Sequence, residues 1–297
     1  TYNWSFSDYG YVDFKSILPK DNDFIVGLYW NGSPFISIKE LDSLFKSNTP
    51  IFWRLSDMWS FTGGCHYSFG CKKYIEQCGC CPQLESNEIF DITHKNMMKK
   101  INWQNNNLII ICPSKWIYDR AKESRIFGNA RSHIVYTGID LNCFAPTDRE
   151  AARKKLNLEI NKKYILFGAM NATEDKRKGW DHLKNALSKA QDNVDFKDCE
   201  LLIFGSDKKQ ESISLDIKIH YYDHVLDQNK LALIYSAANI FVAPSTEENL
   251  ANTCIESIGC GTAVVAFDIG GMAEIIDHKK SGYLAKPFNE DDLANGI

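Results

Sequence analysis

Two glutamates, Glu248 and Glu256, lie eight residues apart in the stretch FVAPSTEENLANTCIESIGCGTAVVAF, which spans residues 241–267. The stretch runs from one apolar segment, through these acidic residues and a short amphipathic segment, to another apolar segment. Carboxylate oxygens accept hydrogen bonds from hydroxyl groups, so Glu248 can bind the hydroxyls of a sugar and Glu256 a ribose diol. The alternative is that both are solvated glutamates on a surface helix.

A cluster of cysteines is the second candidate for chemistry. Five of the ten cysteines lie close together, and four of them have the spacing Cys65-x5-Cys71-x6-Cys78-x2-Cys81. Four thiolates complete the tetrahedral shell of a structural zinc ion, which would order a loop that has few apolar anchors. We predict such a zinc site. Disulfides and reduced packing cysteines are the alternatives, and Cys80 is a bystander.

Alternating strands and helices must position these residues. Apolar segments typical of buried strands are predicted at 23–30, 50–56, 107–114, 132–139, 163–170, 199–206, 217–223, 239–245 and 262–267. Helical patterns are predicted between them at 37–47, 114–124, 179–190, 228–238 and 250–259. Continuous apolar strands that alternate with helices indicate parallel sheets covered on both faces.

The alternation occurs twice, so we predict an α/β protein of two Rossmann-like domains that face a cleft. The first comprises residues 1–145 and contains a Cys-rich loop at 60–90. The second comprises residues 146–297. Ligands of open α/β sheets bind outside the carboxyl ends of the strands. The strand predicted at 239–245 ends just before Glu248, and the amino end of the next helix suits a phosphate at the same edge.

Composition and charge exclude several classes of protein. Apolar residues make up 44% of the 297 residues and charged residues 24%, as in globular proteins. The net charge of -4 gives no reason to expect a nucleic-acid partner. No apolar run is long enough to span a membrane, and the first residues do not resemble a signal peptide. We therefore expect a cytoplasmic location.

Several motifs together closely resemble the retaining glycosyltransferases of family 4, which have the GT-B fold. They are the glutamate pair with SIGCGTAVVAF, GGMAEIIDHKKSGYLAKP (270–287), VYTGIDLNCFAP (135–146), LFGAMNATEDKRKGWDHL (166–183) and DQNKLALIYSAANIFVAPSTEEN (227–249). The resemblance implies an enzyme that transfers a sugar, with retention of its anomeric configuration, to a saccharide or lipid-linked acceptor. The donor would be a UDP- or GDP-sugar bound by the second domain, and the first domain would hold the acceptor.

Site residues follow from the resemblance by motif position. Glu248 would contact the donor sugar and take part in catalysis, and Glu256 would hold the ribose. Asn249 and Leu250 would offer backbone amides, and Gly168 would lie beside the donor.

The segment DKRKGWD (175–181) would supply cations for the diphosphate. Lys178 matches the lysine of the family, but the position of the family's arginine falls near Ala172. Whether Arg177 substitutes for that arginine is open. The alternative for the whole segment is a solvated turn that binds no ligand. No Asp-x-Asp metal motif occurs in a suitable loop, so we expect no catalytic metal. Positive side chains and the helix dipole would stabilise the leaving group instead.

The stretch RLSDMWSFTGGCHYSFGCKKYIEQCGCCPQL (54–84) resembles a subgroup associated with exopolysaccharide and capsule assembly. Many members have His-Asp where this chain has Ser56-Asp57. Asp57 is the acidic candidate for binding or deprotonating the acceptor hydroxyl, and His66 is available for a catalytic or a structural role. Lipid-linked acceptors in the family imply peripheral association with the inner face of the plasma membrane.

The resemblance also implies that both ends are missing: no glycine-rich loop precedes the first strand, and NEDDLANGI stops where a helix should begin. A nucleotide-sugar-binding protein that has lost turnover is therefore a second hypothesis. An epimerase or phosphorylase of the same fold is a third.

Overall fold

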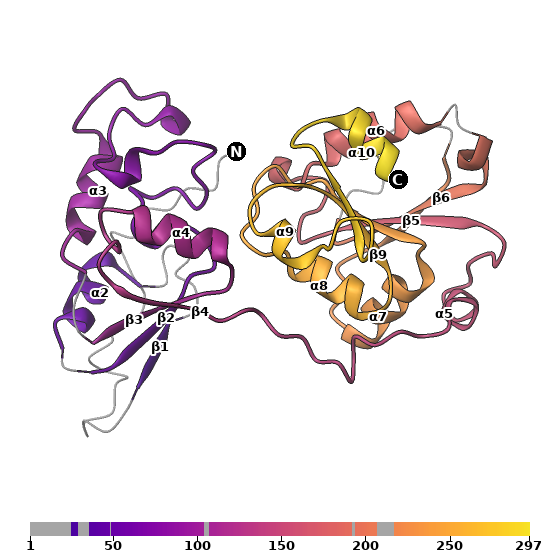
Figure 1. Ribbon diagram of the computed structural model, residues 1–297, viewed down its shortest axis with the longest axis horizontal. Coiled ribbons are helices and arrows are strands. Elements are labelled where there is room, and N and C mark those ends of the chain that lie inside the picture. Colours follow the sequence, from indigo (N-terminus) through magenta and orange to yellow (C-terminus); the bar gives the residue numbers. More distant parts are fainter. Residues whose placement is uncertain (1–24, 29–35, 48, 104–106, 192–193, 207–216) are drawn as a thin grey trace. The chain divides into compact units, whose positions relative to one another are not determined.

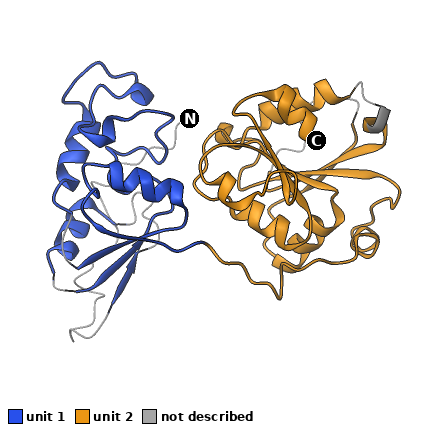
Figure 2. Ribbon diagram, in the orientation of Figure 1, with its two compact units in different colours: residues 1–136 blue, residues 137–297 orange. Residues whose placement is uncertain are grey.

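The computed structural model describes residues 25–28, 36–47, 49–103, 107–191, 194–206 and 217–297 (Figure 1). The chain divides into two compact units, residues 1–136 and 137–297 (Figure 2). The boundary predicted at residue 145 lies inside the second unit. Phe144 is buried in the core of that unit, and Ile139 packs against the same core.

The first unit is built on a parallel four-stranded sheet in the order β1-β2-β3-β4. Its strands are β1 (Val26–Leu28), β2 (Ile51–Arg54), β3 (Leu108–Cys112) and β4 (Arg131–Ile134), and its helices are α2 (Ile38–Phe45), α3 (Ile92–Lys100) and α4 (Lys115–Glu123). Each strand lies within or next to an apolar segment that predicts it. The predicted strand at 23–30 is described only at residues 25–28.

Serine side chains start two of these helices. Ser37 accepts a hydrogen bond from the Glu40 N–H, and the Glu40 side chain accepts one from the Ser37 N–H, which forms a complete capping box at α2. Ser114 caps α4 through the Ile117 N–H. The third helix, α3, was not predicted. Asp91 caps it by accepting hydrogen bonds from the N–H groups of Thr93 and His94.

The second unit contains a parallel six-stranded sheet in the order β10-β9-β8-β5-β6-β7. Its strands are β5 (Lys163–Gly168), β6 (Cys199–Phe204), β7 (Ile219–Tyr222), β8 (Ile240–Ala243), β9 (Ala263–Phe267) and β10 (Gly282–Ala285). Its helices are α5 (Arg149–Lys155), α6 (Trp180–Ala190), α7 (Gln228–Ala237), α8 (Asn252–Gly259), α9 (Met272–Ile275) and α10 (Glu290–Gly296). The last of these, α10, lies in the segment NEDDLANGI, where the resemblance led us to expect the chain to stop as a helix begins.

Alternate residues of the strands build two cores on the two faces of this sheet. Leu166 of β5 and Val264 of β9 pack with α5, α7 and α8. Their neighbours Phe167 and Val265 pack with α6 and α10 on the opposite face (Figure 1). A parallel sheet with helices on both faces is the predicted fold class, and it is confirmed here for the second unit.

The Cys-rich segment of the first unit has more apolar anchors than the sequence indicated. It forms short 3-10 turns at Trp59–Phe61, Lys73–Ile75 and Pro82–Leu84. The rings of Phe61 and Tyr74 meet edge to face at 5.7 Å between centroids, and Tyr67 stacks on Trp116 at 6.5 Å. Aromatic packing therefore orders this segment, and the expectation of a loop with few anchors is wrong.

Within the part of the chain that the structure describes, no helix is both long and apolar enough to cross a membrane.

Candidate functional site

The candidate site lies at the carboxyl edge of the six-stranded sheet, where β8 leads into α8. The strand ends at Ala243, and the helix begins at Asn252, two residues later than predicted. Glu248 lies in the connecting loop and is 6% exposed, so it is not a solvated surface glutamate. A buried carboxylate requires partners for its charge.

Two cations provide that partnership. One carboxylate oxygen of Glu248, Oε2, lies 2.8 Å from the Lys178 ammonium nitrogen and 3.0 Å from an Arg177 guanidinium nitrogen. Burial alone would raise the pKa of Glu248, but Lys178 and Arg177 outweigh it and lower the pKa to about 2. Glu248 is therefore ionised at neutral pH. The site places a carboxylate and two cations at one point of the sheet edge.

The local backbone sets the direction of the Arg177 side chain, and its role in binding the diphosphate stays a prediction. Asp175 caps a 3-10 turn over Lys176–Lys178 by accepting a hydrogen bond from the Arg177 N–H. In this turn the neighbouring side chains of Arg177 and Lys178 converge on Glu248 and do not point apart. Ala172, near the expected arginine position, is fully buried in the core.

Two glycines hold the loops of the site together. A Cβ on Gly179, whose φ is +76°, would lie 1.8 Å from the Pro244 carbonyl oxygen. One on Gly270, whose φ is +56°, would lie 1.7 Å from the Glu248 carbonyl oxygen. Both positions therefore require glycine. The Thr246 N–H also donates to the Arg177 carbonyl at 2.8 Å, which ties the glutamate loop to the cation turn.

Glu256 lies on α8 and has a different environment. The buried Tyr235 hydroxyl, from α7, donates to its Oε2 at 3.0 Å. Burial raises the pKa of Glu256, and the Tyr235 hydrogen bond opposes only part of that effect. Sequence reasoning missed Tyr235, which lies within an apolar helix and carries no signal of a polar role.

The remaining residues proposed for donor binding occupy varied positions. Asn249 is buried, and its carbonyl accepts a hydrogen bond from the Gly271 N–H at 3.0 Å. Leu250 is half-buried in the same loop. Gly168 ends β5, and a Cβ there would lie 2.3 Å from the Phe204 ring. Gly168 thus leaves room for the Phe204 ring of the neighbouring strand, and its role beside a donor stays a prediction.

In the first unit, Asp57 and His66 form a pair. The His66 Nδ1 lies 2.7 Å from one carboxylate oxygen of Asp57, and the other carboxylate oxygen accepts from the Trp59 N–H at 2.8 Å. Both side chains are largely buried. Asp57 follows β2 at the carboxyl edge of its sheet, the same kind of position that Glu248 occupies in the second unit.

The four cysteines predicted to bind zinc do come together. Cys65, Cys71, Cys78 and Cys81 line a cavity of about 20 Å³. All are free thiols, so disulfides are absent among the described cysteines. Over the described ranges, however, no three His, Cys, Asp or Glu side chains form a group that could hold a metal ion. The thiols as they stand therefore do not support the predicted structural zinc.

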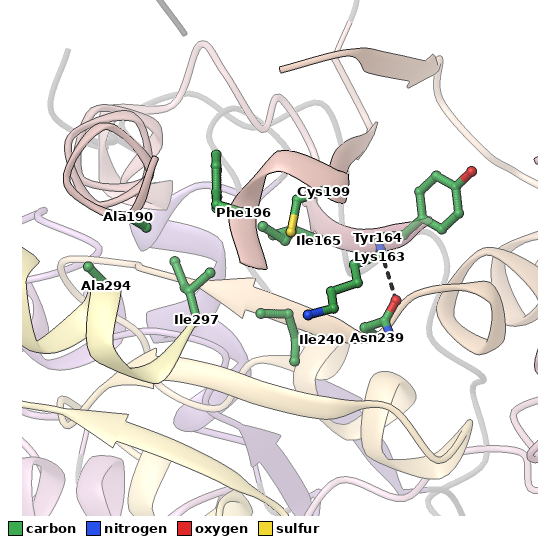
Figure 3. A pocket seen from close by; sticks show the side chains of 10 residues that line it. All are labelled: Lys163, Tyr164, Ile165, Ala190, Phe196, Cys199, Asn239, Ile240, Ala294 and Ile297. Carbon is green, nitrogen blue, oxygen red and sulfur yellow. Dashed lines mark hydrogen bonds between the residues drawn. The ribbon is translucent and has the colours of Figure 1, made fainter. Parts of the chain in front are cut away.

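A larger cavity of about 220 Å³ lies at the opposite edge of the six-stranded sheet (Figure 3). It is lined at the amino ends of the strands by Lys163 and Ile165 of β5, Cys199 of β6 and Ile240 of β8. Ligands of this sheet type bind at the carboxyl edge, so this cavity is separate from the candidate site.

Comparison with known proteins finds a family match within the second unit. Residues 161–297 match the family described as "Glycosyl transferases group 1". This part of the chain is therefore similar to group 1 glycosyltransferases. The match contains Arg177, Lys178, Glu248 and Glu256.

Curated relatives align mainly to the same half of the chain. The D-inositol 3-phosphate glycosyltransferase of Mycobacteroides abscessus is 28% identical over 180 residues, which cover 57% of this chain and 38% of that protein. The N,N'-diacetylbacillosaminyl-diphospho-undecaprenol alpha-1,3-N-acetylgalactosaminyltransferase of Campylobacter jejuni is 30% identical over 171 residues, covering 55% and 43%. The chain thus spans less than half the length of these relatives.

Solved structures extend the likeness in fold to both units. The sucrose-phosphate synthase of Thermosynechococcus elongatus matches with a TM-score of 0.66 and 20% identity, over 92% of this chain and 63% of that one. Anabaena HepE, solved in complex with UDP-glucose, matches with a TM-score of 0.60 and 18% identity, over 91% and 67%. These matches support the predicted GT-B fold.

Proposed function

We propose that this chain is the core of a retaining glycosyltransferase that uses a UDP- or GDP-sugar. One observation carries the proposal: two cations converge on a buried glutamate at the carboxyl edge of the sheet, in the part of the chain that is similar to group 1 glycosyltransferases. A diphosphate needs compensating positive charge, and Arg177 and Lys178 are the pair of cations at this edge that share one anionic partner.

The chemistry of donor binding follows from the charges at the site. The diphosphate of the donor takes hydrogen bonds from Lys178 and Arg177, and the sugar lies toward Glu248. Glu256 accepts from the ribose hydroxyls, for which a fixed carboxylate is well suited. As the bond between the sugar and the diphosphate breaks, the same cations stabilise the charge that develops on the leaving nucleoside diphosphate. An oxygen of that leaving group assists the acceptor hydroxyl.

The first unit supplies the acceptor side in this proposal. Asp57 binds or deprotonates the acceptor hydroxyl, and the neighbouring His66 orients its carboxylate. The Campylobacter jejuni relative is named for a diphospho-undecaprenol compound, which carries a lipid. For this chain the proposal includes a saccharide or lipid-linked acceptor. It also includes a role in cell-surface polysaccharide synthesis at the cytoplasmic face of the membrane.

The first experiment separates an enzyme from a binding protein. The chain is incubated with a panel of UDP- and GDP-sugars while release of nucleoside diphosphate is measured, and binding of each donor is measured by calorimetry. Release from one donor, with retention at the sugar carbon, supports the proposal. Binding without release in the presence of saccharide and lipid-linked acceptors indicates instead a nucleotide-sugar-binding protein.

The contact between Lys178 and the diphosphate is tested by replacing this lysine and, as a control, Lys176 of the same turn. Lys178→Ala should weaken binding of the nucleoside diphosphate by about 1.5–3 kcal/mol, as for a hydrogen bond to a charged group. The nucleoside alone should bind as before. Lys176→Ala removes an exposed lysine from the same turn and serves as the control. Equal losses for nucleoside and nucleoside diphosphate in Lys178→Ala would contradict the assignment.

A further inference from the structure

Lys100, in the last turn of α3, is a buried cation that the proposed function does not use. Its side chain is 0% exposed, although lysines are almost never fully buried without a partner for their charge. Among the described residues its contacts are backbone carbonyl oxygens and an aromatic ring, and no carboxylate there lies within ion-pair distance of it. A lysine in such a position calls for an explanation of what it holds.

Three contacts take up the three N–H groups of this ammonium. Its Nζ donates to the Trp59 carbonyl oxygen at 2.6 Å and to the Thr62 carbonyl oxygen at 3.2 Å. The same Nζ lies 3.6 Å from the centroid of the Trp59 ring, which is a close cation–π contact. Because an ammonium has three donors and no acceptor, all of its hydrogen-bonding capacity is directed at the turn formed by residues 59–62.

That turn lies inside the loop that brings Asp57 and His66 together. The Met58 N–H donates to the His66 carbonyl oxygen at 2.9 Å, which closes the loop. The Trp59 N–H donates to one carboxylate oxygen of Asp57 at 2.8 Å, and the other oxygen lies 2.7 Å from the His66 Nδ1. Trp59 therefore contacts Asp57 through its N–H and Lys100 through its carbonyl oxygen and ring.

A second contact holds the same loop against α3. A Cβ on Gly63 would lie 2.5 Å from the Thr93 carbonyl oxygen, so the loop backbone approaches the helix more closely than a side chain would allow. The Thr62 hydroxyl donates to the Cys65 carbonyl oxygen at 2.7 Å, immediately before His66. The helix thus contacts the loop at its first turn as well as at its last.

The charge of Lys100 also acts on Asp57. Burial lowers the pKa of Lys100 to about 7, and negative charge on Cys65, Cys78 or Asp57 would oppose that effect. The attraction is mutual, so the ammonium stabilises a charged carboxylate on Asp57.

We propose that Lys100 is a positioning residue for the acceptor side of the reaction: it anchors residues 59–62 to α3, and this turn holds the Asp57 carboxylate against His66. The inference rests on the proposed function, in which Asp57 binds or deprotonates the acceptor hydroxyl. Lys100 is fully buried and acts only through the turn. A carboxylate promotes such a step only when it is held in the productive orientation, and displacements of about 1 Å are costly.

The test compares Lys100→Met with Lys99→Met. Methionine keeps the unbranched apolar stem but has no ammonium, and Lys99 is the exposed neighbour of Lys100 on the same helix. With no donor or acceptor present and at one fixed pH, the NMR signal of the His66 Nδ1 reports on its contact with Asp57. The signal should shift in Lys100→Met and match the wild type in Lys99→Met.

Turnover gives a second measurement of the same effect. With a donor and an acceptor that support transfer, Lys100→Met should lower kcat by about 10- to 100-fold, because the Asp57 carboxylate is displaced. The KM for the donor should stay unchanged, since the donor binds to the second unit in the proposed function. Lys99→Met should keep both constants. Equal kcat values in the two variants would overturn the inference.

The NMR comparison separates this inference from the proposed function. An unchanged His66 signal in folded Lys100→Met would overturn the inference, whether or not the chain transfers sugar. A shifted signal in a chain that transfers no sugar would support the anchoring by Lys100 and count against the proposed function.

If Lys100→Met does not fold, Gly63→Ala disturbs the same anchoring from the side of the loop. The added Cβ would push the loop away from the Thr93 carbonyl oxygen, so the His66 signal should shift and kcat should fall here too. A folded Gly63→Ala variant with the wild-type His66 signal would show that α3 does not position the pair.

Discussion

Glu248 and Glu256 are the same residue type, eight positions apart, yet the two regions that hold them act on the carboxyl group in opposite ways. In the loop after β8, Lys178 and Arg177 overcome the cost of burial and lower the pKa of Glu248 to about 2. On α8, burial is opposed only by the neutral hydroxyl of Tyr235, and the pKa of Glu256 is raised. The spacing is a sequence property, whereas the contrast comes from the partners.

The contrast also separates the roles of the two residues. Glu248 already forms ion pairs with two cations, so it holds the positive side chains of the site in position. Among the described residues, the side chain that hydrogen-bonds to Glu256 is the neutral Tyr235 and no cation pairs with it, so the charge of its carboxylate is poorly compensated. A hydroxyl-rich ligand such as ribose would supply donors that favour that charge.

The largest expected effect is on stability. Glu248→Gln keeps the shape but removes the charge, which leaves two cations partly buried at the site. We expect a loss of about 3 kcal/mol in the free energy of unfolding at pH 7, the lower end for a broken buried pair, because Arg177 also contacts Asp175. Glu256→Gln should be neutral or slightly stabilising. Urea denaturation of both variants measures the difference, and equal losses would remove the contrast.

Acid should weaken the fold through Glu248. Its pKa in the folded state is lowered from 4.5 to about 2. The stabilisation is therefore present above pH 4.5 and is lost as the pH falls through 2, which amounts to about 3 kcal/mol. Glu256 has the opposite sign: its contribution is present below pH 4.5 and is lost as the pH rises through its raised pKa. Unfolding measured between pH 5 and pH 2.5 should show a shallower decline in Glu248→Gln than in the wild type.

A smaller effect should appear in nucleotide binding. Glu256→Ala should weaken binding of a nucleoside diphosphate by about 1–3 kcal/mol, because a charged acceptor for ribose is lost. The 2',3'-dideoxy nucleotide lacks the hydroxyls and should bind both proteins equally. An equal loss for the dideoxy nucleotide would mean that the carboxylate acts on something other than ribose.

The sequence predicted much of this site, and its omissions have physical causes. The apolar segments at 163–170 and 239–245 each contain a strand of the sheet, because buried parallel strands are apolar throughout. The helix α3 was missed because its stretch ITHKNMMKK is mostly polar. The strand β10 was missed because it lies at the edge of the sheet, where three of its four residues are only half-buried, so GYLA is not a continuous apolar run.

The contacts within the site depend on tertiary structure. Whether Arg177 and Lys178 point the same way depends on a 3-10 turn, and sequence neighbours alone do not specify that turn. The pairing of Asp57 with His66 likewise requires the chain to fold back over nine residues. In each case the residue types were visible, and the directions of their side chains were not.

The smallest effect should come from Tyr235, and it tests whether the support for Glu256 is local. Its hydroxyl is buried and donates to Glu256 at 3.0 Å. Tyr235→Phe keeps the ring that packs against Phe204 and Phe241 and removes only this hydrogen bond, so unfolding should lose about 1 kcal/mol. Because the hydrogen bond lowers the pKa of Glu256, that pKa should rise further in the variant, and nucleotide binding should weaken mainly toward acidic pH. NMR titration of the Glu256 carboxyl measures the shift. An unchanged pKa together with unchanged binding would show that Tyr235 only fills the core.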